Sequence, residues 1–182
     1  VVDNFIRRDT QGFVQDPSHA QLVYSMASKV LCDKNAHELS CKKASSLASF
    51  LLLNCRGYVD GYVPLIAQDI VCFRWQQCGY PSKSLRTALL RLSAHCLIYN
   101  ARVTVDHLHN SNLLAIFFVN FCEAFEVQGY FDEDSPRGHS AIPSKINDKR
   151  TAVLGLLAVL KLPYDSLPDY MQKYLTKILQ IT

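Results

Sequence analysis

Histidine and cysteine residues are where chemistry would be expected first, and here their spacing fits neither a metal site nor a nucleophile. His107 and His109 are two residues apart, so they do not share a helix face, and no nearby cysteine or carboxylate completes a zinc site. His95 and Cys96 are adjacent, which on a helix turns them about 100° apart and separates nucleophile from base. The chain also lacks GxSxG, GxGxxG and GxxxxGK[ST] loops. We therefore expect no enzyme activity, no metal and no cofactor.

One polar segment carries a compact acidic cluster. Residues 129–146 (GYFDEDSPRGHSAIPSKI) contain two prolines and no helical stripe, which predicts an irregular loop, and their composition favours disorder. Within it, Asp132, Glu133 and Asp134 form the cluster. Their carboxylates are candidates for contact with a basic partner, and the alternative is a solvated loop without a partner.

Composition narrows the class of protein further. The chain has 182 residues, of which 49% are hydrophobic and 19% charged. This apolar content is enough to form a core that keeps most of the chain folded. The net charge is only +3 and the basic residues are scattered among acids, so we expect no direct nucleic-acid binding. Seven cysteines without CxxC spacing indicate reduced thiols in a cytosolic or nuclear protein.

No segment is long and apolar enough to cross a membrane. The longest apolar run, Leu113–Val119, is far shorter than the roughly 20 residues that a bilayer requires, and no signal peptide opens the chain. Apolar residues at both ends of the chain predict that it is a piece of a longer polypeptide.

Apolar residues recur at helical spacing almost everywhere. The pattern predicts helices over about 1–8, 18–32, 36–55, 60–78, 83–100, 101–108, 113–127, 147–161 and 167–181. Most links are short, which forces neighbouring helices to run antiparallel. The sequence therefore predicts an all-α fold, a HEAT-repeat-like α-solenoid of antiparallel helix pairs in which residues 1–182 are one segment of a longer superhelix. Gly155, inside one helix, predicts close packing against a neighbour.

Four stretches also resemble a known family in the same order. They are YSMASKVL (Tyr24–Leu31), LLLNCRGYVDGYVPLIAQDI (Leu51–Ile70), LRTALLRLSAHCLIYNA (Leu85–Ala101) and DKRTAVLGLLAVLKLP (Asp148–Pro163). The chain resembles the importin-β superfamily of nuclear transport receptors (karyopherins), in particular the C-terminal region of the importin-7/8 type, from about residue 1 to 165. The loop at 129–146 is longer than in that family, which suggests a lineage-specific insertion.

The resemblance implies a receptor that carries cargo proteins, including basic ones, through nuclear pores. It also implies regulation by the Ran GTPase, contact with FG nucleoporins, and shuttling between nucleus and cytoplasm. Helices at about 59–78, 112–126 and 167–181 would then be inner helices that face cargo, and those at about 36–54, 82–100 and 147–161 would be outer helices. On the inner helices, Asp69 and Arg74 are expected to be exposed for contact with cargo.

Two other interpretations remain open. An exportin of the cellular-apoptosis-susceptibility type would have the same architecture but the opposite response to Ran-GTP. A helical-repeat scaffold or regulatory subunit unrelated to transport would show the same periodicity.

Overall fold

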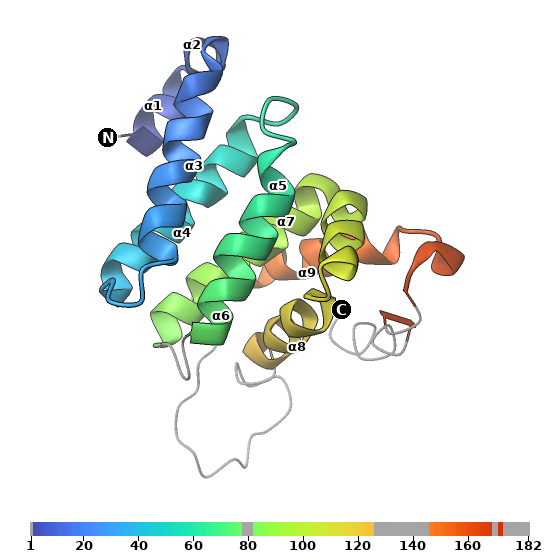
Figure 1. Cartoon of the computed structure of the whole chain (residues 1–182). Helices are drawn as coiled ribbons and strands as arrows, with labels where there is room; N and C mark the ends of the chain where they lie inside the picture. The colour runs from blue at the N-terminus through green and yellow to red at the C-terminus, as the bar shows by residue number, and fades with distance from the viewer. Residues whose placement is uncertain (1, 78–81, 126–145, 169–170, 173–182) are drawn as a thin grey trace.

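A computed structural model describes residues 2–77, 82–125, 146–168 and 171–172 of the chain (Figure 1), and the structural statements below concern these residues. The described part contains no β-strand. In chain order its elements are α1 (Val2–Arg8), α2 (Thr10–Gln15), α3 (Pro17–Leu31), α4 (Glu38–Asn54), α5 (Tyr62–Leu65), the π-helical turns η1 (Ile66–Cys72), α6 (Phe73–Gln77), α7 (Lys83–Asn110), α8 (Leu114–Phe125), α9 (Ile146–Leu160) and the short 3₁₀ helix η3 (Tyr164–Ser166).

The helices form two layers. Helix α3, the α5–η1–α6 column and α8 lie in the front layer of Figure 1, and α4, α7 and α9 lie behind them. Helix α7 is central, because it packs against α4, α5, η1, α8 and α9. This arrangement confirms the all-α, helical-repeat solenoid that the sequence predicts.

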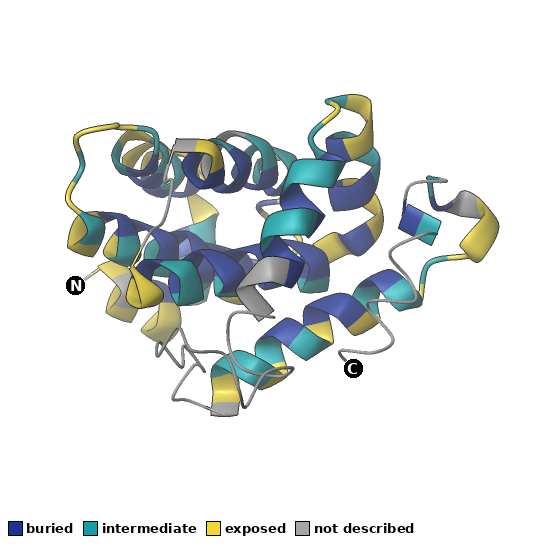
Figure 2. Cartoon of the chain, turned by 90° about the horizontal axis from the view of Figure 1, so that it is seen from below, coloured by how far each residue is buried: buried dark blue, intermediate teal, exposed yellow. Residues whose placement is uncertain are grey.

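The apolar stripes of the two layers face each other and form one continuous core (Figure 2). Its largest fully buried side chains include Phe117, Phe118 and Phe121 of α8, whose rings contact one another. Leu51 of α4 and Leu89 of α7 are completely buried in the same cluster. Each helix therefore depends on its neighbours to bury its apolar face, as expected for a repeat array.

Side-chain caps fix where several helices begin. Asp16 precedes α3, accepts a hydrogen bond from Ser18 N at 2.9 Å and is followed by Pro17 in the first helical position. Ser82 precedes α7 and accepts from Leu85 N at 3.4 Å. These contacts satisfy amide groups that the first turn leaves without an intrahelical acceptor.

The structure departs from the predicted helices at three places. The helix expected over 60–78 contains the π-helical turns of η1, and the short α2 is not predicted at all. The helices expected over 83–100 and 101–108 are two halves of α7, separated by Asn100 with non-helical φ −158° and ψ 93°. Asn100 Oδ1 accepts from Val103 N at 3.1 Å, so its side chain caps the second half. The loop predicted over 129–146 and most of the helix predicted over 167–181 fall outside the described residues.

No helix in the described ranges has both the length and the hydropathy of a membrane span.

Candidate partner-binding groove

A shallow groove of about 450 Å³ lies in the front layer. It runs between α3, the η1–α6 column and Leu113, the residue before α8. Its lining residues, referred to below as the groove, are Ser28, Cys32, Gln68, Cys72, Phe73, Gln76 and Leu113. Three segments far apart in the sequence thus contribute to one concave surface.

The middle wall of the groove is the π-helical segment η1. A π-helix bonds residue i to i+5, and single π-helical turns inside α-helices occur often at functional sites. Ile66, Ala67 and Val71 of η1 are fully buried, whereas Gln68 is half-buried. The wide turns therefore keep one face of the column in the core while Gln68 lines the groove.

A polar network fixes Gln68 to the end of α7. His107 Nε2 is in hydrogen-bonding contact with Gln68 Oε1, and Ser111 Oγ donates to the same oxygen at 3.3 Å. Because that oxygen is an acceptor, His107 must carry its proton on Nε2 in this contact. The amide of Gln68 is thus held in place before any partner arrives.

The groove combines apolar and uncharged polar side chains and carries no formal charge. Its side chains supply the aromatic ring of Phe73 and the branched aliphatic side chain of Leu113. They also supply two amides, two thiols and one hydroxyl group, from Gln68, Gln76, Cys32, Cys72 and Ser28. Such a surface suits an uncharged protein segment that combines an apolar side chain with backbone amides. Nothing in the lining resembles a set of converging acid, base and nucleophile. Within the described ranges, no three His, Cys, Asp or Glu side chains are grouped so as to hold a metal ion.

The thiol of Cys96, buried in the core, is expected to be unreactive. Burial raises the pKa of the Cys96 thiol on α7 well above its usual value, and the neighbouring Cys72 raises it further. Since the thiolate is the reactive form, Cys96 is a core residue, as its position on the apolar stripe predicts.

The structure places one of the sequence-predicted contact residues, Arg74, differently from the expectation. Arg74 is 4% exposed, and its Nη1 donates to the Asp33 carbonyl oxygen at 3.1 Å, so the prediction that it is exposed is wrong. The guanidinium is buried because α6 packs beside the α3–α4 connection, where that carbonyl needs a donor. Asp69 lies in η1, but its side chain is outside the described residues, as are Asp132, Glu133 and Asp134 altogether.

Sequence patterns did not identify the groove residues. Gln68 does interrupt the apolar run around Ile66 and Val71, and a polar residue in such a run is a signal for a site. The π-helical turns of η1, which pack against α7, have no comparable signature in the sequence.

Comparisons with known proteins agree with this architecture. Importin-8 of Homo sapiens is 26% identical over 169 residues, which cover 89% of this chain and 15% of that protein. A probable importin-7 homolog of Dictyostelium discoideum is 24% identical over 136 residues, covering 72% of this chain and 13% of that protein. An importin beta-like SAD2 homolog of Arabidopsis thaliana is 23% identical over 168 residues, which cover 91% of this chain and 15% of that protein.

These similarities are weak individually but consistent, and they support a relationship to the importin-β family. The chain spans about 15% of the length of importin-8 and of the SAD2 homolog. No protein-family model matches the chain. No solved structure matches it either.

Proposed function

We propose that this chain is a cargo-binding segment of a nuclear transport receptor, equivalent to the C-terminal region of an importin of the 7/8 type. The observation that carries the proposal is the similarity to importin-8, which extends over 89% of this chain. The fold of stacked helix pairs is consistent with it. The segment acts as HEAT repeats in a longer superhelix, by protein–protein binding without catalysis.

Cargo binds across the front layer, with the groove as its anchor point. Phe73 and Leu113 offer apolar contact and the fixed amide of Gln68 offers hydrogen bonding, so an uncharged segment of a cargo protein inserts between the flanking helices. Asp69, on the same column, and the acidic cluster Asp132, Glu133 and Asp134 extend recognition to basic residues of the cargo. Ran-GTP and FG nucleoporins bind the whole receptor, which shuttles between nucleus and cytoplasm.

The test is a pull-down with the full-length receptor, in the presence and absence of Ran locked in its GTP form. An importin releases cargo when Ran-GTP is added. Cargo bound only with Ran-GTP would instead assign an exportin of the cellular-apoptosis-susceptibility type, and indifference to Ran would assign a scaffold or regulatory subunit.

A pair of variants then tests the groove. Gln76 is exposed and lines the groove, so Gln76→Arg places a bulky charge in it and should weaken cargo capture by about tenfold or more. Gln21→Arg makes the same change at an exposed position of α3 outside the groove and should leave capture unchanged. Equal capture by both variants would place the cargo site elsewhere on the receptor.

A further inference from the structure

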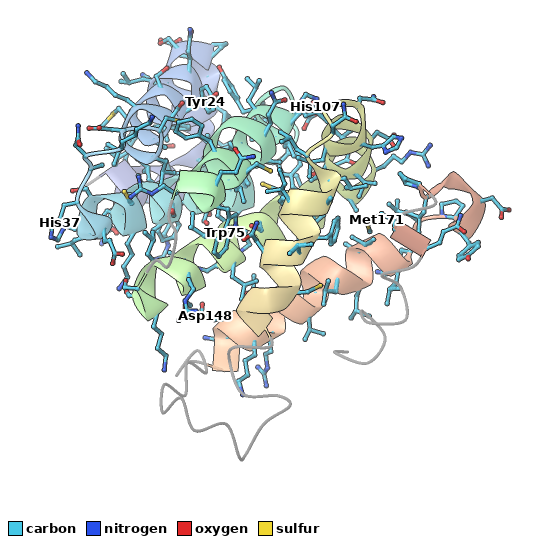
Figure 3. All side chains as sticks on the ribbon, turned by 60° about the horizontal axis from the view of Figure 1, so that its bottom comes forward. Tyr24, His37, Trp75, His107, Asp148 and Met171 are labelled. Atoms are coloured by element: carbon cyan, nitrogen blue, oxygen red, sulfur yellow. The ribbon has the colours of Figure 1, made fainter. Side chains whose placement is uncertain are left out.

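The back layer has a second surface, independent of the groove. Ser82 N, at the start of α7, donates to Glu38 Oε1, at the start of α4, at 3.0 Å. Arg91 Nη1 of α7 lies 3.4 Å from Oδ1 of Asp148, in the first turn of α9 and labelled in Figure 3. Helices α4, α7 and α9 therefore begin on the same side of the molecule.

This side collects basic residues that are scattered in the sequence. Segments 33–43, 82–91 and 147–150, referred to below as the basic edge, contain eight basic and three acidic side chains. That is an excess of five positive charges, whereas the whole chain has an excess of three. The basic side chains are Lys34, Lys42, Lys43, Lys83, Arg86, Arg91, Lys149 and Arg150.

The three acidic residues of the basic edge already accept hydrogen bonds or pair with a basic side chain. Hydrogen bonds from Ser82 lower the pKa of the Glu38 carboxyl, and Asp148 pairs with Arg91. Asp33 Oδ1 accepts from Asn35 N at 2.9 Å. The exposed basic side chains of the basic edge include Lys43 of α4, Lys83 of α7 and Arg150 of α9.

We propose that the basic edge binds an acidic segment of a partner protein. Helices packed side by side are about 8–10 Å apart, and an extended chain advances roughly 3.3 Å per residue. An acidic side chain at every third residue would therefore meet α4, α7 and α9 in turn. The positive ends of the three helix dipoles add to the attraction.

A polypeptide fits the basic edge better than a nucleic acid does. Each strand of duplex DNA carries a phosphate about every 3.4 Å, and single-stranded nucleic acid is usually held by aromatic side chains that stack on its bases. The three segments of the basic edge contain no Phe, Tyr or Trp, and their three carboxylates would repel a dense row of phosphates. Sparse positive charge at helix spacing matches the sparser charge of an acidic peptide.

The experiment measures binding of the 182-residue chain to a fluorescent peptide of repeating Glu-Ser-Ser, by anisotropy at low and high salt. The basic-edge variant combines Lys43→Glu, Lys83→Glu and Arg150→Glu, one exposed residue from each helix. The control variant combines Arg8→Glu, Lys29→Glu and Lys161→Glu, also exposed, and changes the net charge by the same amount. Thermal melting verifies that both variants fold.

The expected result is peptide binding that weakens with salt, falls by about tenfold or more in the basic-edge variant, and stays within about twofold in the control variant. Equal losses in both variants would show that overall charge alone attracts the peptide, and would overturn the proposal. So would the absence of binding at low salt. Tighter binding of an oligothymidylate of equal charge, lost in the basic-edge variant, would replace the acidic peptide with nucleic acid.

Discussion

Gly155 of α9 lies directly against Ala94 of α7. A Cβ atom added to Gly155 would lie 3.0 Å from the Cα and 3.1 Å from the Cβ of Ala94. Contacts of this length to backbone are tighter than nine in ten real Cβ contacts, so a side chain at this position would have to push the backbone of α7 away by a few tenths of an ångström. The close packing predicted from a glycine inside a helix is thereby confirmed, and it sets the spacing of α7 and α9.

Replacing Gly155 should destabilise the fold, although glycine is a poor helix former. On an exposed helix, Gly→Ala would stabilise by about 1 kcal/mol. Here the new methyl group forces α7 and α9 apart, and overpacking costs about 1–3 kcal/mol, so we expect a net loss for Gly155→Ala and a larger one for Gly155→Val. Urea unfolding measures the change. Leu154→Ala, at a 54% exposed neighbouring position, is the control and should change stability by about 0.5 kcal/mol or less. A more stable Gly155→Val would contradict the close contact.

Removal of the Tyr99 hydroxyl should loosen the α4–α5 connection. Tyr99 OH donates to Asp60 Oδ1 and accepts from Gly57 N at 2.8 Å, and Gly57 has a φ of +86° that favours glycine. We expect Tyr99→Phe to lower the free energy of unfolding by about 1–2 kcal/mol, because both groups lose a partly buried hydrogen bond. Tyr58→Phe makes the same change in the same connection at a 61% exposed ring and should be neutral in the same urea titration. Equal stability of the two variants would mean that the hydroxyl does not hold this connection.

His95 should make the fold sensitive to acid. Burial and, to a smaller extent, the positive charge of Arg91 lower the pKa of its imidazole from 6.5 to about 4, and its Nδ1 has no hydrogen-bond partner among the described residues. The unfolded chain therefore binds a proton below pH 6.5 that the folded chain takes up only near pH 4, and stability falls as the pH drops through this interval. At pH 5 the loss from this residue is about 2 kcal/mol.

The measurement is urea unfolding at pH 7.5 and pH 5 for the native chain and for His95→Leu, which places an apolar side chain without a titratable group at this buried position. The difference between the two pH values should shrink by about 2 kcal/mol in the variant. His109→Leu, at an exposed histidine near the end of α7, should retain the native difference. An unchanged difference in His95→Leu would show that another group governs the acid response.

The sequence predicts those structural features that depend on residues close together in the chain. Helical spacing of apolar residues predicts the class of fold, and Gly155 predicts a close contact, because both depend on which face a helix buries. The break at Asn100 was predicted too, as a boundary between two helices rather than a kink within α7. These features follow from short stretches of chain.

The remaining features depend on contacts between distant segments. The sequence predicts that Arg74 is exposed. Its guanidinium is nevertheless buried, because it donates a hydrogen bond to the carbonyl oxygen of Asp33, 41 residues away. Gln68 becomes part of a groove only because α7 brings His107 and Ser111 beside it. The basic edge likewise exists only because three helices begin on one side. No pattern of neighbouring residues contains that information.

The thiols of the chain offer a last prediction, which checks the groove without a partner. Cys32 lines the groove and is half-buried, whereas Cys41, Cys55 and Cys96 are completely buried. Burial also raises the pKa of Cys55 and Cys96, which reduces their reactive thiolate. We therefore expect N-ethylmaleimide to modify Cys32 of the folded chain well before these three, as followed by peptide mass mapping.

Two controls separate an open groove from a loosened fold. In concentrated urea all four thiols should react at similar rates, because their native environments are lost. Cys32→Ser should remove the modification at this site and leave Cys41, Cys55 and Cys96 slow. If Cys32 reacts as slowly as Cys96 in the native chain, the groove is closed in solution, and the cargo anchor between α3 and η1 must be abandoned. If all four react quickly without urea, the two layers open far more readily than their continuous core implies.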